Sequence, residues 1–220
     1  MHSRCCSDLL VYEVVLTISL LVGGTTATAA GGVFVAREFS QREKKSISDF
    51  LSEDRSKRLI DDSEVWDAAW KEYKKSGEDV WKLGSEASVP NSLKTTCKDK
   101  LNSKISGIDS KEYKDFLNYC TRDTLVSDLI KDSGKKLLVK GNGNESHWVA
   151  VWTAYVDDSR NKGRTKGNDI WRLNDWDSKN VQKNSAPSTF MAECESNSKK
   201  PFFDVRGALY LDTLKFCTQN

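Results

Sequence analysis

Hydrophobic and polar positions divide the chain into an uncharged N-terminal stretch and a long polar part. Residues 14–36 are a run of 23 residues without a charged side chain, first apolar and then rich in glycine, alanine and threonine. As a helix this run would be about 34 Å long, which is enough to cross a bilayer. From residue 38 onward, apolar residues recur at the three- and four-residue spacing of amphipathic helices. The pattern predicts a transmembrane helix followed by a mainly α-helical polar part.

An ordered series of aromatic and apolar residues occurs twice in the polar part, from about residue 62 to 122 and from about 144 to 219. The distance between matched residues grows from 82 to 90 and then to 97 positions, so the second copy carries insertions in the polar stretches 157–168 and 174–185. Surface loops tolerate such changes in length. The series predicts an internal duplication. The matched pairs are Trp66 and Trp148, Trp70 and Trp152, Tyr73 and Tyr155, Trp81 and Trp171, Pro90 and Pro187, Cys97 and Cys194, Tyr113 and Tyr210, Leu117 and Leu214, and Cys120 and Cys217.

Each copy contains three stretches with the pattern of a short helix. In the first copy they begin after the cap candidates at 61–63, at the proline of 88–90 and after 107–109, because aspartate, serine and proline favour the start of a helix. Gly77 ends the first of them. We therefore expect two tandem copies of a small three-helix module. Its apolar faces carry Trp66, Trp70 and Tyr73, then Leu93, Cys97 and Leu101, then Tyr113, Leu117 and Cys120.

These patterns divide the chain into five segments. An N-terminal segment with the transmembrane anchor (1–37) precedes a charged stalk that we expect to be helical (38–61). Module one (62–123) and module two (144–220) are joined by a connecting helix and loop (124–143), which ends in a turn rich in glycine and asparagine.

A module of mixed α and β structure is the alternative fold. Aromatic and β-branched residues at 148–152, and apolar residues at 137–139, are also typical of strands. The stretch of module one that matches 148–152 is 66–70, and its residues favour a helix. The duplication therefore favours the mainly α-helical fold.

Charge excludes one large class of partner. The chain has 34 basic and 32 acidic residues, which are spread without a basic stripe. A nucleic-acid-binding protein is expected to concentrate positive charge on one face. We therefore expect no nucleic-acid partner, and membrane lipid around residues 14–36 is the partner that the pattern predicts.

The N-terminal stretch could also be a cleavable signal peptide, with an apolar region at 9–22 and a cleavage site of small residues at 27–29. Glu13 interrupts that apolar region, so the sequence favours an uncleaved anchor. Two signals conflict over its orientation. Basic residues at 37–45 follow the anchor, and the positive-inside rule would then keep the polar part in the cytoplasm. The cysteines indicate the opposite side.

Four cysteines of the polar part come as one pair per module, with 22 residues between the partners. Because the helix faces that carry them must meet in a three-helix module, we predict one disulfide between Cys97 and Cys120 and another between Cys194 and Cys217. An even, repeated set of this kind is typical of oxidising compartments. Four free, buried thiols are the alternative.

The sequence shows no convergent set of catalytic or metal-binding residues. The two histidines are His2 and His147, and no Cys-x-x-Cys or His-x-x-x-His spacing occurs. His147 is the one candidate for a general base after the predicted anchor, and module one has no histidine at the matching position. We therefore expect a protein that is not an enzyme and binds no cofactor.

Six of the seven tryptophans occupy matched positions, which is typical of residues that fill a core. Trp176 belongs to the second insertion and has no counterpart in module one. It is the candidate for an exposed contact with a partner, and a packed lid is the alternative.

Several short motifs complete the pattern. They are the Trp-x3-Trp-x2-Tyr opening at 66–73, Leu93-Lys94-x-x-Cys97, and the endings Tyr119-Cys120-Thr121 and Phe216-Cys217-Thr218. Together with the short Gly/Ala/Thr-rich anchor, they resemble the large paralogous families of small anchored proteins in haemotropic mycoplasmas. The resemblance covers the whole chain. Those families have no established activity or catalytic residues, so it implies a surface-displayed membrane protein of unknown biochemical role.

The expected function follows from the anchor, the cysteines and the resemblance. We expect a single-pass cell-membrane protein whose C-terminal part lies outside the cell and contacts a host protein or glycan, or varies antigenically. The alternative is a cytoplasm-facing membrane scaffold with reduced cysteines. The two functions differ in the side of the membrane on which the modules lie.

Overall fold

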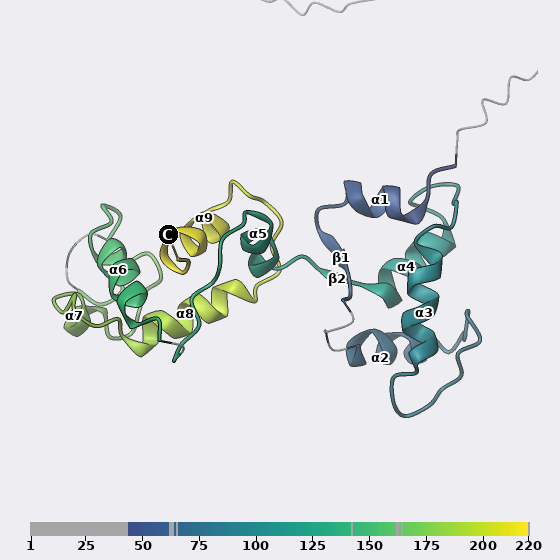
Figure 1. Cartoon of the computed structure of the whole chain (residues 1–220), viewed down its shortest axis with the longest axis horizontal. Helices are drawn as coiled ribbons and strands as arrows, with labels where there is room; N and C mark the ends of the chain where they lie inside the picture. Colours follow the sequence, from purple (N-terminus) through teal and green to yellow (C-terminus); the bar gives the residue numbers. More distant parts are fainter. Residues whose placement is uncertain are drawn as a thin grey trace, which may run out of the picture. The chain divides into compact units, whose positions relative to one another are not determined.

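The computed structural model describes residues 44–219, except 62, 63, 65, 142, 162 and 164 (Figure 1). Across these residues it has nine helices and one two-stranded antiparallel sheet, so the predicted mainly α-helical fold is confirmed. The predicted anchor at 14–36 lies outside the described residues. Among the residues that the structure describes, no helix is long and apolar enough to cross a membrane. In chain order the elements are α1 (Ile47–Glu53), β1 (Lys57–Leu59), α2 (Asp67–Ser76), α3 (Asn91–Lys100), α4 (Lys111–Cys120), β2 (Thr121–Asp123), α5 (Val126–Asp132), α6 (Glu145–Val156), α7 (Trp176–Lys179), α8 (Ser188–Ser198) and α9 (Ala208–Phe216).

The N-terminal half, residues 44–123, has a core of its own. Helix α4 packs against both α2 and α3 (Figure 1). Trp70, Leu93 and Phe116 contribute one fully buried side chain from each of these helices. Helix α1 adds Ile47 to the same core. The apolar faces predicted for the first copy are therefore the faces that meet.

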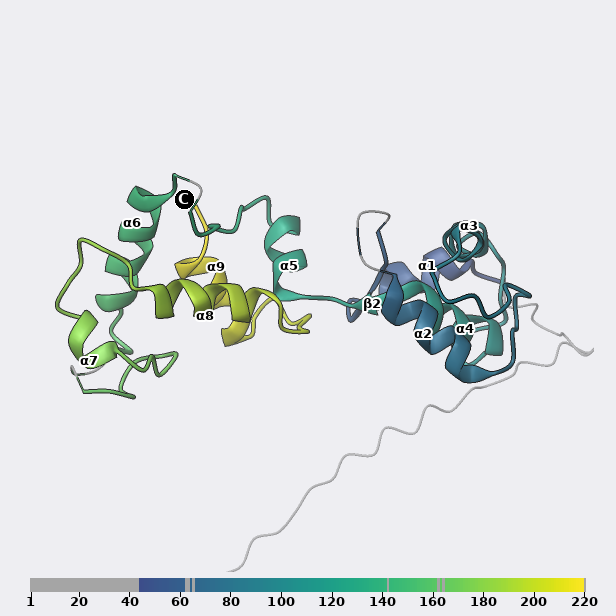
Figure 2. The ribbon, with the colours of Figure 1, turned by 90° about the horizontal axis from the view of Figure 1, so that it is seen from below.

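The C-terminal half, residues 124–219, has a separate core. Helix α9 packs against α5, α6 and α8 (Figure 2). Trp152, Phe190 and Phe216 are fully buried where α6, α8 and α9 meet. A smaller cluster between α5 and α9 contains Val126 and Tyr210.

Local sequence explains where several helices begin and end. Helix α2 ends at Gly77, which has φ +69°, a left-handed conformation that costs glycine little. The Ser110 side chain accepts a hydrogen bond from the backbone N–H of Tyr113 at the start of α4, 3.2 Å away. Pro90 and Pro187 stand directly before α3 and α8 in an extended conformation. Proline therefore marks both helix starts from the N-cap position.

Strand structure is limited to short pairings among the described residues. Helix α6 covers 148–152, so a strand there is wrong. Strand β1 pairs with β2, with Arg58 opposite Arg122. Leu137, in the other stretch whose residues are typical of a strand, forms an isolated antiparallel bridge with Thr218.

The structure differs from the predicted stalk at 38–61. Within the described part of that segment, Ile47 of α1 is 1% exposed in the core of the N-terminal half. The Ser46 side chain caps this helix, and the Asp49 carboxylate accepts the Ser46 backbone N–H at 2.8 Å. A short amphipathic helix of this kind packs on the core and does not project into solvent as a stalk, because removing its apolar face from water is favourable.

The helix predicted as a connector packs in the same way. Val126 and Ile130 of α5 are 0% and 1% exposed. They lie against α8 and α9, so α5 belongs to the C-terminal half. Each half therefore begins with a short helix that packs on the core of that half.

Candidate functional site

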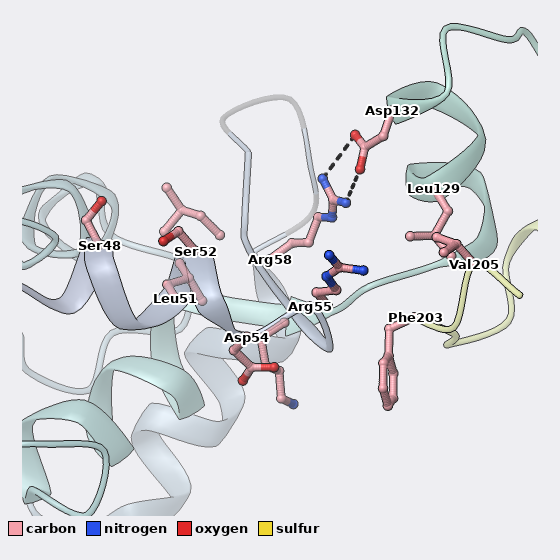
Figure 3. Close-up of a pocket in the computed structure, with 12 residues that line it drawn as sticks. Ser48, Leu51, Ser52, Asp54, Arg55, Arg58, Leu129, Asp132, Phe203 and Val205 are labelled. Carbon is pink, nitrogen blue, oxygen red and sulfur yellow. Dashed lines mark hydrogen bonds and ion pairs between the residues drawn. The ribbon is translucent and has the colours of Figure 1, made fainter.

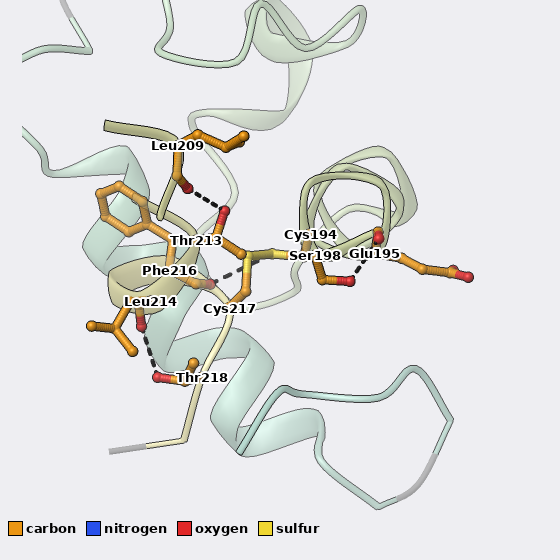
Figure 4. The surroundings of a disulfide bond; sticks show 9 residues. All are labelled: Cys194, Glu195, Ser198, Leu209, Thr213, Leu214, Phe216, Cys217 and Thr218. Carbon is orange, nitrogen blue, oxygen red and sulfur yellow. Dashed lines mark hydrogen bonds between the residues drawn. A yellow bond between two sulfur atoms is a disulfide. The ribbon is translucent and has the colours of Figure 1, made fainter. Parts of the chain in front are cut away.

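Two buried disulfides occupy corresponding places in the halves. Cys97 of α3 is joined to Cys120 at the end of α4, and Cys194 of α8 to Cys217 directly after α9. The Cα atoms are 5.5 Å apart in both pairs. These are the pairs that the sequence predicts. Figure 4 shows the second disulfide between the last two helices, where the Thr218 hydroxyl donates to the Leu214 carbonyl at 2.7 Å.

A tyrosine and an aspartate fix the loop that follows the first long helix of each half. The Tyr73 hydroxyl donates to the Asp79 carboxylate at 2.7 Å and accepts the backbone N–H of Trp81 at 2.9 Å. Tyr155 does the same with Asp169 and Trp171, at 2.7 and 2.9 Å. Each tyrosine therefore uses its hydroxyl as donor and acceptor at once.

The pKa shifts of the tyrosines and of Asp79 indicate that these residues stabilise the loops. Burial, followed by the hydrogen bond to Asp169, raises the pKa of Tyr155 far above its usual range. Burial likewise raises the pKa of Tyr73. The hydrogen bond from Tyr73 lowers the pKa of Asp79. Each tyrosine hydroxyl therefore stays protonated near neutral pH and holds its loop as a hydrogen-bond donor.

Three backbone hydrogen bonds within the N-terminal half have equivalents within the C-terminal half. In each half, two bonds join the start of the first helix to the loop between the last two helices, and a third joins the strand-like segment to the end of the last helix, at distances of 2.8 to 3.1 Å. Lys82 and Arg172, at matched positions, both have a positive φ, +56° and +54°. The bond pairs are Ile47 N to Ser103 O with Val126 N to Lys200 O, Ile105 N to Lys45 O with Phe202 N to Thr124 O, and Ile60 N to Cys120 O with Leu138 N to Cys217 O.

A surface groove of about 600 Å³ is the best candidate for a contact site. The segment from α1 to β1 forms one side of it, and α5 with the loop before α9 forms the other (Figure 3). Apolar side chains from both sides line it, and two of them, Phe203 and Val205, are 54% and 42% exposed. Arg55 and an ion pair between Arg58 and Asp132 add charge. The groove can therefore contact a ligand that is partly apolar and partly charged.

The two sides of the groove are held together at Thr124, which is 1% exposed. Its backbone N–H and its hydroxyl donate to the carbonyls of Ser56 and Arg55, both at 2.8 Å. Its own carbonyl accepts the N–H of Phe202 at 2.8 Å. One residue thus bonds to both sides of the groove.

Arg122 makes a second connection, next to Thr124. Its guanidinium donates to Asp128 of α5 at 2.6 and 3.0 Å and to Glu64 at 2.7 Å. Burial opposes ionisation of Asp128, but Arg122 and the N–H of Leu125 lower its pKa below the usual value. The ionised carboxylate is thus part of the folded structure.

Trp176 is not an exposed contact. Its side chain is 2% exposed, and its ring lies edge-on to those of Trp152 and Tyr155, with centroids 6.0 and 5.9 Å away. Its indole N–H donates to the Gly163 carbonyl at 3.2 Å. The insertion folds back over two aromatic rings of the core, so the packed lid is the correct alternative.

The remaining expectations concern chemistry. His147 is exposed at the first turn of α6. Within the described ranges, no group of three or more histidine, cysteine, aspartate or glutamate side chains could hold a metal ion. The sequence did not predict the groove, because its residues come from three separate segments of the chain. A partial signal existed in Ser48-Asp49 and Ser127-Asp128, which share one pattern at the starts of α1 and α5.

Comparisons with known proteins add no relative. No protein-family model, no curated protein and no solved structure matches this chain.

Proposed function

We propose that the chain is a membrane-anchored, surface-displayed binding protein without enzymatic activity, built from two copies of one small module. The single observation that carries the proposal is the pair of corresponding disulfides. Disulfides persist in oxidising compartments and are rare in the cytosol. An anchor at residues 14–36 would then hold both modules outside the cell.

Several observations support the tandem duplication. The disulfides, the tyrosine–aspartate loops and three backbone hydrogen bonds occur at matched positions in both halves. Matched contacts of this kind are expected when two copies of one module fold in the same way. The copies extend to α1 and α5, so we infer that each module begins with the short helix and not at residue 62 or 144.

A contact with a host protein or glycan would use the exposed groove. Large exposed apolar side chains gathered in one place often mark an interaction site. Phe203, Val205 and Arg55 offer apolar and charged contacts together. The alternative is a cytoplasm-facing scaffold with reduced cysteines, which the basic residues after the predicted anchor favour.

The experiment is protease shaving of intact source cells, followed by mass spectrometry of the released peptides. Release of peptides from residues 62–220, while a cytosolic control protein stays intact, supports the surface location. Cleavage only after lysis contradicts it and supports the scaffold.

A second measurement on the same cells tests the cysteines. Alkylation without a reductant, before lysis, should leave Cys97, Cys120, Cys194 and Cys217 unlabelled and paired within each module. Labelling of all four under denaturing conditions without a reductant would contradict the disulfides.

A further inference from the structure

The groove has an equivalent in the N-terminal half. A second surface groove, of about 790 Å³, lies between α1 and the loop before α4. Phe50, Glu53 and Ile108 line it, and Ile108 is 57% exposed. The corresponding residues of the C-terminal half, found at the same places on α5 and in the loop before α9, are Leu129, Asp132 and Val205, and all three line the first groove.

Each half thus presents the same kind of receptor surface. It has an apolar residue on the short first helix, a carboxylate one turn later and an exposed apolar residue on the loop. We name the surface of the N-terminal half the first receptor surface (Phe50, Glu53, Ile108) and that of the C-terminal half the second (Leu129, Asp132, Val205).

The second receptor surface faces a basic segment of the same chain. Strand β1, Lys57-Arg58-Leu59, lines the groove opposite it. Arg58 donates two hydrogen bonds to the Asp132 carboxylate. Leu59 adds an apolar side chain to the same groove. The contact therefore joins a basic-basic-apolar segment to an acidic and apolar surface.

The C-terminal half carries the counterpart of this segment, Lys135-Lys136-Leu137. The correspondence is fixed by the backbone, because Leu137 is bridged to Thr218 as Leu59 is paired with Thr121. Lys135 and Lys136 are exposed, and no ion pair joins either side chain to another described residue. This segment lacks the acidic partner that Lys57-Arg58-Leu59 has.

We propose that the chain associates with a second copy of itself, head to tail. The segment Lys135-Lys136-Leu137 of one copy binds the first receptor surface of the next. This inference rests on the proposed correspondence between the halves and not on the surface location. The segment and the first receptor surface, which do not contact each other within one molecule, are complementary in charge, since Glu53 and Asp109 line the groove that the lysines would enter.

The incoming lysines would compete with one existing contact. Lys45 lies in the same groove and pairs with Glu53 at 2.7 Å. Both side chains are more than half exposed, so this ion pair is weak and exchangeable. A contact between two different surfaces leaves one of each free on every dimer, so it can add further copies.

The test uses the full-length oxidised chain in a non-ionic detergent, with self-association measured by sedimentation at low salt. Reversing the charge of the segment (Lys135→Glu/Lys136→Glu) should weaken association at least about tenfold, because like charges then face each other. Reversing the receptor surface (Glu53→Lys/Asp109→Lys) should do the same. Lys166→Glu, an exposed lysine elsewhere, is the matched control and should change nothing.

Mixing the two reversed proteins gives the decisive result. Opposite charges meet again only between the two variants, so the mixture should associate with the two variants alternating in equal amounts. Association that persists unchanged in both variants, as contacts between anchors would cause, overturns the proposal. A wild-type chain that stays monomeric at high protein concentration also overturns it.

A zero-length carbodiimide cross-link of the wild-type chain covers the case in which a variant fails to fold. A mixture of isotopically light and heavy protein distinguishes links between copies from links within one. Links from Lys135 or Lys136 of one copy to Glu53 or Asp109 of another are expected, and their absence contradicts the proposed contact. Neither result depends on the side of the membrane, so failure here leaves the shaving experiment unaffected.

Discussion

At the residue scale, the most informative positions are the two tyrosines whose hydroxyls hold the loops. Their geometry is the same, but their surroundings differ. Asp169, the partner of Tyr155, is 5% exposed, whereas Asp79, the partner of Tyr73, is exposed. A buried carboxylate that loses a hydrogen bond cannot replace it with water. The same substitution should therefore have different costs in the two halves.

We predict that Tyr155→Phe lowers the free energy of unfolding by about 1–3 kcal/mol, because it leaves the buried Asp169 with one donor fewer. Tyr73→Phe should lower it by only about 0.5–1.5 kcal/mol, since water can reach Asp79. Urea unfolding followed by circular dichroism measures both. Equal losses would contradict the difference in burial.

Asp128 is a second residue with a testable electrostatic role. Folding lowers the pKa of Asp128 below its ordinary value of 3.8. The ion pair therefore stabilises the fold fully at pH values above the pKa of the unfolded chain, and this stabilisation is lost as the pH falls through the pKa of the folded protein. Asp128→Asn should lower the free energy of unfolding by roughly 1–2 kcal/mol at neutral pH. The difference from wild type should shrink below about pH 4.

The measurement is urea unfolding of the wild type and Asp128→Asn at a series of pH values. Asp99→Asn, at an exposed position on α3, is the control and should give the same free energy as the wild type throughout. A difference between Asp128→Asn and wild type that stays constant down to pH 2 would show that the carboxylate charge is not what stabilises the fold.

At the element scale, the short helices α1 and α5 decide the extent of each half. In both, the aspartate at the third helical position, Asp49 or Asp128, accepts the backbone N–H of the residue before the helix, and both bury their first residue, Ile47 or Val126. A capped helix of seven residues is not stable alone. Its stability must come from packing on the core.

Because α1 packs on the core, a substitution at Ile47 should have a large effect on the free energy of unfolding, whereas the same substitution in a solvent-exposed stalk would have almost none. Ile47→Ala should lower the free energy of unfolding by about 2–5 kcal/mol, as expected for a buried aliphatic side chain. Ser52→Ala, on the exposed side of the same helix, should change it by less than about 0.5 kcal/mol. If thermal unfolding shows equally small effects for both variants, residues 47–53 do not pack on the core and the predicted stalk is correct.

At the scale of the whole molecule, the halves have separate cores and separate disulfides. The core around Trp70 and Phe116 and the core around Trp152 and Phe190 share no residue. The contacts across the groove that join them are mainly polar, at Thr124, Arg122 and Arg58. A substitution that destabilises one core should therefore lower the stability mainly of the half that contains it.

We predict that Cys97→Ala/Cys120→Ala lowers the stability of the N-terminal half by about 3 kcal/mol, the value expected from loop-closure entropy for a cross-link of this span. Hydrogen exchange should show faster exchange in α2, α3 and α4, and unchanged protection in α6, α8 and α9. Cys194→Ala/Cys217→Ala should give the reverse pattern. Faster exchange in both halves from either variant would show that they unfold together.

Some parts of the structure could be predicted from the sequence and others could not. The helices at Trp66, Pro90 and Tyr113, and their later counterparts, followed from periodicity and start signals that depend on neighbouring residues alone. The cysteine pairs followed from their place on faces that must meet. The groove did not, because Arg58, Asp132 and Phe203 lie far apart in the sequence and single exposed residues carry no periodic signal.

Local features could be read from the residue pattern, namely where the helices lie, which faces are apolar and which cysteines can pair, because these depend on spacings of a few residues or on a repeated order. The other features become visible only in the fold. It alone showed that α1 and α5 belong to the cores and that Trp176 is buried, since burial depends on segments that meet only after folding. For the same reason, only the fold could show that a basic segment of one half faces the acidic surface of the other.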